Sequence, residues 1–387
     1  MKKFFALLLS LAMVLALVAC GQKETTTPDD TQTPDDTTPE VEYKIAMITD
    51  YGDITDQSFN QTTYEACKAF AEDNSIEFSY FKPAGDNTAD RVAMIEKAVN
   101  DGFNVIVMPG YAFGGAIVEA APEFPDVKFI ALDVAAGDLL ETAVAKAGEA
   151  YDYTPENWDL NKYVDMSNVY CAVYQEELCG YMAGYAAVKL GYKNLGFLGG
   201  MSVPAVVRYG YGFVQGVDAA AADLGLTDVK LNYIYGGQFF GDADITAVMD
   251  TWYQGGTEVV FACGGSMFAS VAAAASANDG AVVGVDVDQS FESDTVITSA
   301  MKGLADSVQW ALTKFYGNDF ASIGGTVTSL GAKDNAVGLP TATWSLTQWT
   351  VDEYNTMLAA MADGSLVVDA DYANLASTDN LTLNVIE

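Results

Sequence analysis

Carboxylates in this sequence recur directly after short apolar runs, at places where parallel strands end and small molecules bind. Asp50 follows KIAMIT, and Asp133 and Asp286 close the runs KFIAL and AVVGV. A carboxylate in such a place can accept two hydrogen bonds from hydroxyl or ring N–H groups. A turn or a helix cap is the alternative role, because Asp suits both. The matched positions of Asp133 and Asp286, described below, favour contact with a ligand.

Aromatic rings and a lysine accompany these carboxylates. Phe59 precedes Asn60 at an expected helix start, where a ring and an amide can together hold one planar ligand. Phe239 and Phe240 lie in the segment GGQFFGD. Exposed rings in such loops are normally avoided, although one of the two can fill the core. Lys302 closes another apolar run and is either part of the site or a surface lysine.

The loop before Phe59 holds further acidic residues. Asp50, Asp53 and Asp56 are spaced by three, whereas a calcium loop needs ligands at alternate positions and a closing Glu. We therefore predict no metal here. Ser58 is expected to cap the helix that follows, because a serine before a helix commonly accepts a backbone N–H.

Composition excludes several kinds of chemistry. The chain has no histidine, which removes the usual general base, Ser-His-Asp triads and most zinc sites. A formal charge of −35 disfavours nucleic acid, anionic lipid and heavily phosphorylated ligands. We expect neither an enzyme nor a cofactor. Cys171 and Cys179 could form a disulfide in an exported protein, but buried thiols are favoured.

The first 42 residues are expected to export and tether the protein. Residues 1–19 have a basic start, an apolar run and small residues before Cys20, as a signal peptide does. Leu-Val-Ala-Cys resembles the bacterial lipobox, whose cysteine receives a lipid. A permanent membrane anchor is the alternative, but its apolar run is shorter than the roughly 20 residues that a span needs. Residues 20–42 are rich in Thr, Pro and Asp, which is typical of a disordered tether. We expect a lipid-anchored protein on the extracytoplasmic face of the cell membrane.

Two stretches of the remaining chain are similar to each other. Residues 101–133 and 255–286 both contain a Gly-rich start, an apolar strand, a Gly turn, an Ala-rich helix and an apolar strand ending in Asp. Gly110 therefore matches Gly264, and Asp133 matches Asp286. One α/β unit used twice predicts two lobes, and a cleft between similar lobes can hold a small molecule.

Alternating short apolar runs and helical segments predict an α/β fold with two doubly wound parallel sheets. We predict one lobe from residues 43–192 and 290–320, and the other from 193–289 and 321–387. Strands are expected at 295–299, 326–330 and 366–369 among others, and residues 137–167 look like an inserted excursion. Ligands of such sheets bind beyond the carboxyl ends of the strands.

Six motifs together resemble the basic membrane protein family, which comprises lipid-anchored substrate-binding proteins of ABC importers. They are ITDYGDITDQSFNQ (48–61), FIALD (129–133), GFLGGMSVPAVVRYGYGFVQG (196–216), YQGGTEVVFACGG (253–265), GVDVDQ (284–289) and TSAMKG (298–303). The resemblance implies a type I periplasmic-binding-protein fold with a hinge of several segments. It also implies an ABC permease and ATPase as partners.

The resemblance further implies a nucleoside ligand, because the family includes purine nucleoside receptors. The base would lie between Phe59 and Phe239, with Phe240 possible by loop length. Base-edge contacts would come from Asp50, Asn60 and Asp133, and ribose contacts from Gly264 or Gly265, Asp286 and Lys302. The first loop, the 137–167 excursion and the shortened ACGG depart from the family pattern.

Other functions remain open at this level. A receptor for a sugar or another small polar ligand would keep Asp286 and Lys302 but would not need facing rings. A nucleoside-sensing lipoprotein without a transport role would have the same sequence features. A nucleoside-cleaving enzyme would need a calcium-binding Asp cluster and an acid, and the sequence has neither a DxDxxxDD run nor a histidine.

Overall fold

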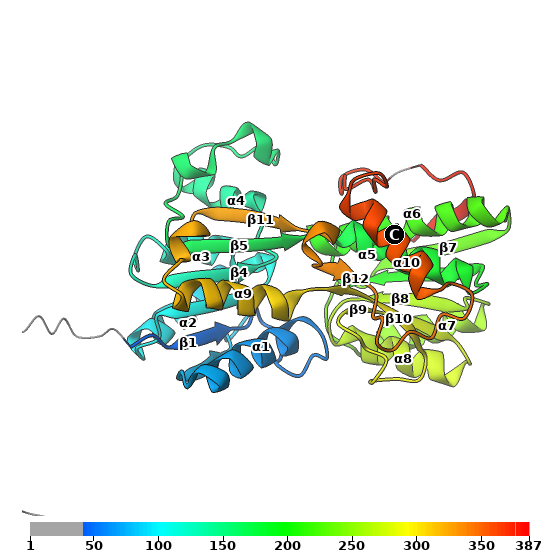
Figure 1. The fold of residues 1–387 in the computed structure, drawn as a ribbon, viewed down its shortest axis with the longest axis horizontal. Helices are drawn as coiled ribbons and strands as arrows, with labels where there is room; N and C mark the ends of the chain where they lie inside the picture. Colours follow the sequence, from blue (N-terminus) through cyan, green and yellow to red (C-terminus); the bar gives the residue numbers. More distant parts are fainter. Residues whose placement is uncertain (1–41, 376, 387) are drawn as a thin grey trace, which may run out of the picture. The chain divides into compact units, whose positions relative to one another are not determined.

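The computed structural model describes residues 42–375 and 377–386, so residues 1–19, Cys20 and almost all of the tether lie outside the described residues. The chain divides into two units, Met1–Glu42 and Tyr43–Glu387. The second unit carries both sheets (Figure 1). Within the described ranges, no helix is long and apolar enough to cross a membrane.

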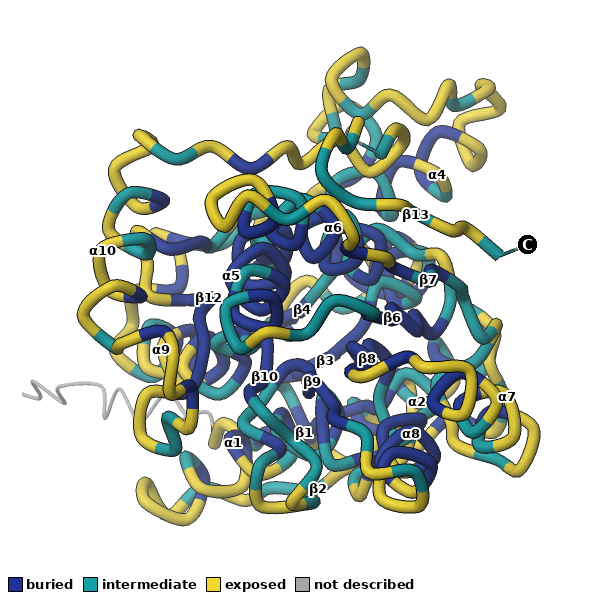
Figure 2. The backbone as a smooth tube through the Cα atoms, turned by 90° about the vertical axis from the view of Figure 1, so that its right-hand side faces the viewer, coloured by how far each residue is buried: buried dark blue, intermediate teal, exposed yellow. Residues whose placement is uncertain are grey.

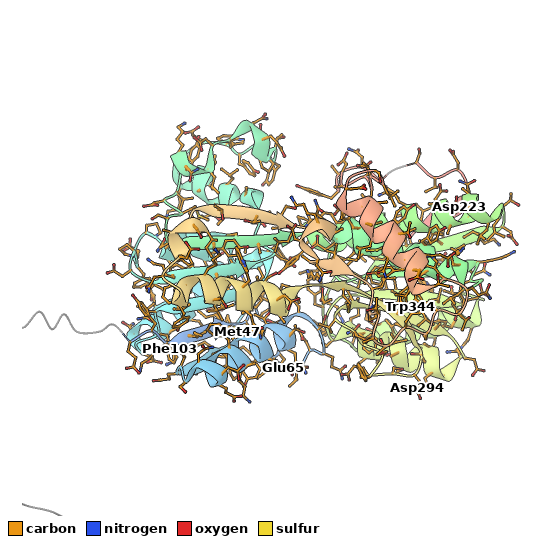
Figure 3. All side chains as sticks on the ribbon, viewed as in Figure 1. Met47, Glu65, Phe103, Asp223, Asp294 and Trp344 are labelled. Atoms are coloured by element: carbon orange, nitrogen blue, oxygen red, sulfur yellow. The ribbon has the colours of Figure 1, made fainter. Side chains whose placement is uncertain are left out.

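The first lobe is built on a six-stranded parallel sheet in the order β11-β5-β4-β3-β1-β2. Its strands are β1 (Ile45–Ile48), β2 (Phe78–Phe81), β3 (Val105–Pro109), β4 (Lys128–Leu132), β5 (Val169–Tyr174) and β11 (Thr326–Leu330). Its helices are α1 (Phe59–Asn74), α2 (Thr88–Asn100), α3 (Gly114–Ala120), α4 (Ala136–Lys146) and α9 (Leu304–Tyr316). The central strands are continuous apolar runs because helices cover both faces of the sheet. Met47, in β1, is fully buried inside this lobe (Figure 3).

The second lobe is built on a seven-stranded sheet in the order β12-β10-β9-β8-β6-β7-β13, in which only β12 is antiparallel to its neighbour. Its strands are β6 (Asn194–Gly199), β7 (Val229–Tyr235), β8 (Val259–Cys263), β9 (Ala281–Asp286), β10 (Val296–Lys302), β12 (Val337–Gly338) and β13 (Leu381–Val385). Its helices are α5 (Glu176–Lys189), α6 (Pro204–Leu224), α7 (Ala243–Gln254), α8 (Met267–Ala277) and α10 (Val351–Ala362). The buried backbone of the strands lies at the centre of the unit, with exposed loops around it (Figure 2).

The two sheets confirm the internal repeat and the predicted fold class. The order β4-β3-β1-β2 in the first sheet matches β9-β8-β6-β7 in the second. A Cβ added to Gly110 would lie 3.2 Å from Cβ of Asp50, and one added to Gly264 would lie 3.1 Å from Cα of Gly200. Each matched glycine thus lies against the loop after the neighbouring strand. Asp133 and Asp286 also share a left-handed backbone, with φ of 58° and 66°.

The strand pairing corrects the predicted lobe ranges. β10 was expected in the first lobe but pairs in the second sheet, and β11 was expected in the second lobe but pairs with β5. Helix α5 also packs in the second lobe, against α6. An apolar run shows that a strand is buried but does not tell which sheet it joins, so the predicted ranges were wrong at these elements.

Within residues 42–375, the chain crosses between the lobes at three places: between Tyr174 and Glu176, between Lys302 and Leu304, and between Leu330 and Ala332. These crossings form the hinge that the resemblance implied. The tail also differs from prediction, because 366–369 is not a strand and β13 was missed. The 137–167 excursion contains α4 and two short 3-10 helices, Pro155–Asn157 and Leu160–Lys162, and lies at the edge of the first lobe (Figure 1).

Candidate functional site

A cavity of about 340 Å³ lies where the carboxyl ends of the strands of both sheets meet. All eight ligand-contact residues expected from the sequence line it: Asp50, Phe59, Asn60, Asp133, Phe239, Gly264, Asp286 and Lys302. They come from the ends of β1, β4, β8, β9 and β10, the start of α1 and the loop after β7. The volume is at the lower end of the range of about 300–1,000 Å³ that is usual for small-molecule sites.

Asp56 caps helix α1 and so fixes the direction of Phe59 and Asn60. Its carboxylate oxygens accept the backbone N–H groups of Ser58 at 3.0 Å, Asn60 at 2.9 Å and Gln61 at 3.0 Å. The side-chain amide of Asn60 also donates to Asp56, at 3.1 Å. The expected cap, Ser58, makes no side-chain capping bond. A carboxylate two residues earlier reaches more N–H donors than a hydroxyl can, and this leaves the Ser58 hydroxyl for another partner.

That partner is Asp286, on the other lobe. Ser58 Oγ donates to Asp286 Oδ2 at 2.6 Å, and Tyr209 Oη donates to Asp286 Oδ1 at 3.2 Å. Gln289, which follows β9, also donates from its side-chain amide to the carbonyl of Gln57 at 2.9 Å. The loop before α1 is therefore bonded directly to the loop after β9. Asp286 joins the lobes in this structure and lines the cavity at the same time.

Lys302 is the central cation of the cavity. Its Nζ lies 2.5 Å from Asp133 Oδ2, 3.5 Å from Glu176 Oε1 and 3.6 Å from Asp286 Oδ1, and its side chain is only 3% exposed. The ammonium also lies 4.8 Å from the ring centroid of Phe59, within cation–π distance. Burial by itself lowers the pKa of Lys302, but the three carboxylates outweigh burial and raise the pKa above its usual value. Lys302 is therefore charged and is not a surface lysine.

Three acidic or amide groups of the first lobe present acceptors to the cavity. Asp50 Oδ1 accepts the N–H groups of Tyr51 at 2.6 Å and Gly52 at 2.7 Å, while burial raises the pKa of its carboxyl. Asn60 Oδ1 and Asp133 Oδ1 are buried and have no hydrogen-bond partner among the described residues. Burial raises the pKa of Asp133, with Lys302 opposing that effect. Buried acceptors without donors are costly, so these atoms indicate a missing donor.

The two candidate rings of the second lobe differ in their surroundings. Phe239 packs on the core of the second lobe, and a Cβ added to Gly200 would come within 2.3 Å of its ring. Phe240 also lines the cavity, but it is 55% exposed. Gly265, with φ of 48°, passes close to the carbonyl of Phe239 and lines the cavity beside Gly264. The geometry favours Phe239 as the better-held ring.

Several cavity residues were missed by the sequence interpretation, among them Asp138, Arg208 and Tyr209. Arg208 and Tyr209 lie within one of the quoted motifs, and Arg208 is one of just two arginines in the chain, which is a usable signal. Asp138 lies in the excursion, where neither repeat nor motif points to it. Burial raises the pKa of its carboxyl to about 7.

The described part of the chain holds neither a metal-binding cluster nor a disulfide. No group of three or more His, Cys, Asp or Glu residues there has an arrangement that could hold a metal ion. Cys67, Cys171, Cys179 and Cys263 are all free and buried, so the bridge between Cys171 and Cys179 is not formed.

Comparison with known proteins gives matches over most of the chain. The family model described as ABC transporter substrate-binding protein PnrA-like matches residues 43–360. An ABC transporter nucleoside-binding protein BmpA of Lactococcus lactis subsp. cremoris is 24% identical over 323 residues, which cover 78% of this chain and 82% of that protein. Basic membrane protein B of Borreliella burgdorferi is 27% identical over 306 residues, covering 77% of this chain and 81% of that protein.

Solved structures agree on the fold. A solute-binding protein of an ABC transporter system from Aeropyrum pernix K1 superposes with a TM-score of 0.63 at 20% identity, covering 85% of this chain and 88% of the other. One from Conexibacter woesei has a TM-score of 0.62 at 21% identity, covering 85% and 99%. At these identities the likeness concerns the fold alone.

Proposed function

Because the chain belongs to the family of PnrA-like substrate-binding proteins of ABC transporters, we propose that it captures a nucleoside with a purine base. Members of this family are binding proteins and not enzymes, and they work with a permease and an ATPase. In the proposed complex the base lies between Phe59 and Phe239, one ring from each lobe. The ribose lies against Gly264, Asp286 and Lys302.

The observation that carries this proposal is the pair of unpartnered acceptors beside two rings. Asn60 Oδ1 and Asp133 Oδ1 lack donors among the described residues, and Asp50 offers a further carboxylate in the same cavity. The edge of a purine base carries ring or exocyclic N–H groups, which can donate to such acceptors. The faces of the base are apolar and stack on aromatic rings. A sugar has hydroxyl donors but no flat face of this kind.

The charge of the cavity favours a nucleoside over a nucleotide. Six Asp residues line it, whereas its cations are Lys82, Arg208 and Lys302. Lys302 is already bound to Asp133, and Arg208 Nε lies 2.7 Å from Glu176 Oε2. A phosphate group would meet more carboxylates than free cations, which is unfavourable in a buried site.

Lobe closure follows from ligand contacts on both sides. A base held by Phe59 of the first lobe and Phe239 of the second makes both sets of contacts only when the lobes are together. A ligand shifts the equilibrium toward the state that it binds better, so the bound protein is closed. The permease then recognises that closed state.

A thermal-shift comparison of the purified protein tests the ligand class. We expect inosine, guanosine and adenosine to raise the melting temperature, since binding to the folded state alone adds stability. Ribose, glucose and amino acids serve as the comparison set and should not raise it. A shift with ribose or glucose and none with the three nucleosides would reject the nucleoside proposal in favour of a receptor for a small polar ligand.

Uptake and anchoring need separate measurements. Cells that lack the protein should lose uptake of a radiolabelled purine nucleoside if it delivers cargo, whereas unchanged uptake would indicate a sensor. We also propose that Cys20 carries the lipid that holds the protein on the extracytoplasmic face. Cys20→Ser should abolish incorporation of labelled palmitate and release the protein from the membrane fraction, and retention of the label would reject this.

A further inference from the structure

A carboxylate outside the expected contact set holds two of the three cations that line the cavity, Arg208 and Lys302. Glu176 is the first residue of α5 and is fully buried. Its Oε2 accepts a hydrogen bond from Arg208 Nε at 2.7 Å, and its Oε1 accepts one from Lys302 Nζ at 3.5 Å. Arg208 and Lys302 line the cavity, whereas Glu176 lies behind them.

This carboxylate lies at the hinge between the lobes. Glu176 follows the crossing from β5 to α5, and the preceding residue, Gln175, donates its backbone N–H to Leu330, where β11 ends at another crossing. Lys302 is the last residue of β10, before the third crossing. The contact between Glu176 and Lys302 therefore joins two hinge segments. Lys302 forms a second ion pair with Asp133 of the first lobe, and Glu176 forms one with Arg208 of the second lobe.

Stability alone does not explain this arrangement. Taking charges out of water costs about as much as their attraction returns, so buried ion pairs often stabilise a fold no better than apolar residues would. A network of this kind does fix the direction of its side chains. Lys302 can reach three carboxylates, and Glu176 is the one that comes from the hinge and not from a strand end beside the cavity.

We propose that Glu176 is a positioning residue of the ligand site, which fixes Lys302 at the hinge so that its ammonium lies between Asp133 and Asp286 when the lobes are closed. The inference rests on the proposed function for its ligand, but the placement of Lys302 is a property of the unliganded protein. Without the Glu176 charge, Lys302 keeps its two cavity partners, and the hinge no longer restrains it.

Glu177 provides a matched control. It follows Glu176 in the same turn of α5, and its side chain is only 6% exposed. Its nearest cationic nitrogen is Arg208 Nε at 4.0 Å, and its Oε2 has no hydrogen-bond partner among the described residues. Glu177→Gln therefore changes a buried glutamate beside Glu176 without altering any contact of Lys302.

The first measurement is ligand-free and follows the reactivity of Lys302 toward acetic anhydride, read by mass spectrometry. Lys68, whose side chain is 49% exposed, is the internal reference. Removal of a neighbouring negative charge lowers the pKa of an amine, so Glu176→Gln should speed acetylation of Lys302 by about threefold or more. Glu177→Gln should leave the rate unchanged. Equal rates in the two variants would overturn the proposal, whether or not nucleosides bind.

The second measurement is inosine affinity by calorimetry. Glu176→Gln should weaken binding by about tenfold, and adding it to Lys302→Gln should cause little further loss, because residues that act as a unit are not additive. Full additivity of the two losses would overturn the proposal. No binding by the unchanged protein would instead reject the nucleoside assignment and leave the acetylation result to decide on Glu176.

If the Glu176→Gln variant does not fold, Glu176→Asp takes its place, because aspartate keeps the negative charge. Because the aspartate side chain is one methylene shorter, we expect Lys302 in this variant to be acetylated faster than in the parent but more slowly than expected for Glu176→Gln. An acetylation rate equal to the parent's would count against the proposal.

Discussion

Replacing Phe239 and Phe240 separately by leucine tests which ring of the second lobe stacks on the ligand. Phe239 packs on the core of its lobe and over Gly200, whereas Phe240 is 55% exposed. Leucine keeps most of the apolar volume, so each change should cost less than about 1.5 kcal/mol of folding free energy. What leucine removes is the flat π face.

The expected loss at Phe239 follows from stacking energies. A base stacked on an aromatic side chain contributes about 1–3 kcal/mol by alanine substitution, which corresponds to roughly 5- to 150-fold in the dissociation constant. We therefore expect Phe239→Leu to weaken inosine binding within that range. Phe240→Leu should change it by less than about threefold, because a half-exposed ring has little contact to lose.

Isothermal titration calorimetry with inosine, together with urea unfolding of the unliganded variants, checks both parts. The unfolding measurement shows whether a loss of affinity comes from damage to the lobe. If Phe240→Leu weakens binding as much as Phe239→Leu does, or more, the assignment of the ring from its burial is wrong. If neither change weakens binding, the ligand is not held between facing rings.

Four further changes test the polar part of the site. Asp286→Asn should lower the free energy of inosine binding and the free energy of unfolding by about 1–3 kcal/mol each, because it removes a charged acceptor of Ser58 and a neighbour of Lys302. Asp56→Ala should lower the free energy of unfolding in urea by about 2 kcal/mol, whereas Ser58→Ala should not uncap α1. Asp138 has a pKa of about 7 in the folded chain but near 4 when unfolded, so its contribution to stability falls as pH rises between those values. Asp138→Asn should therefore melt higher than the parent at pH 8 and equally at pH 4, and equal melting at both would contradict that burial effect.

The positions of the site residues were accessible from the sequence because the chain repeats itself. Asp133 and Asp286 were expected to be equivalent because of their matched places at the ends of β4 and β9, and both have a left-handed backbone. Phe59 was identified from its loop. The partners of these residues were not accessible, since Ser58 and Asp286 are 228 positions apart along the chain. No local pattern links residues at that separation.

Membership of strands in sheets also escaped the sequence. β10 and β11 are recognisable as strands in the sequence. β10 was assigned to the first lobe but joins the sheet of the second, and β11 was assigned to the second lobe but joins the sheet of the first. β13 has the alternation LTLNV of an edge strand, a signal that was present and not used. Asp138 carried no signal, because its burial comes from the way α4 packs beside the cavity.

The amino-acid sequence by itself determined that this protein has two similar α/β lobes, no histidine chemistry and carboxylates at matched strand ends, because periodicity, composition and internal repetition do not depend on which segments meet in space. Only the tertiary structure decided that Asp56, and not Ser58, caps α1, that Lys302 is a buried and charged centre, and that Glu176 holds it from the hinge. These contacts depend on which segments cross between the lobes. The free energy of a buried charge depends on all the groups around it, and a sequence does not show which groups those are.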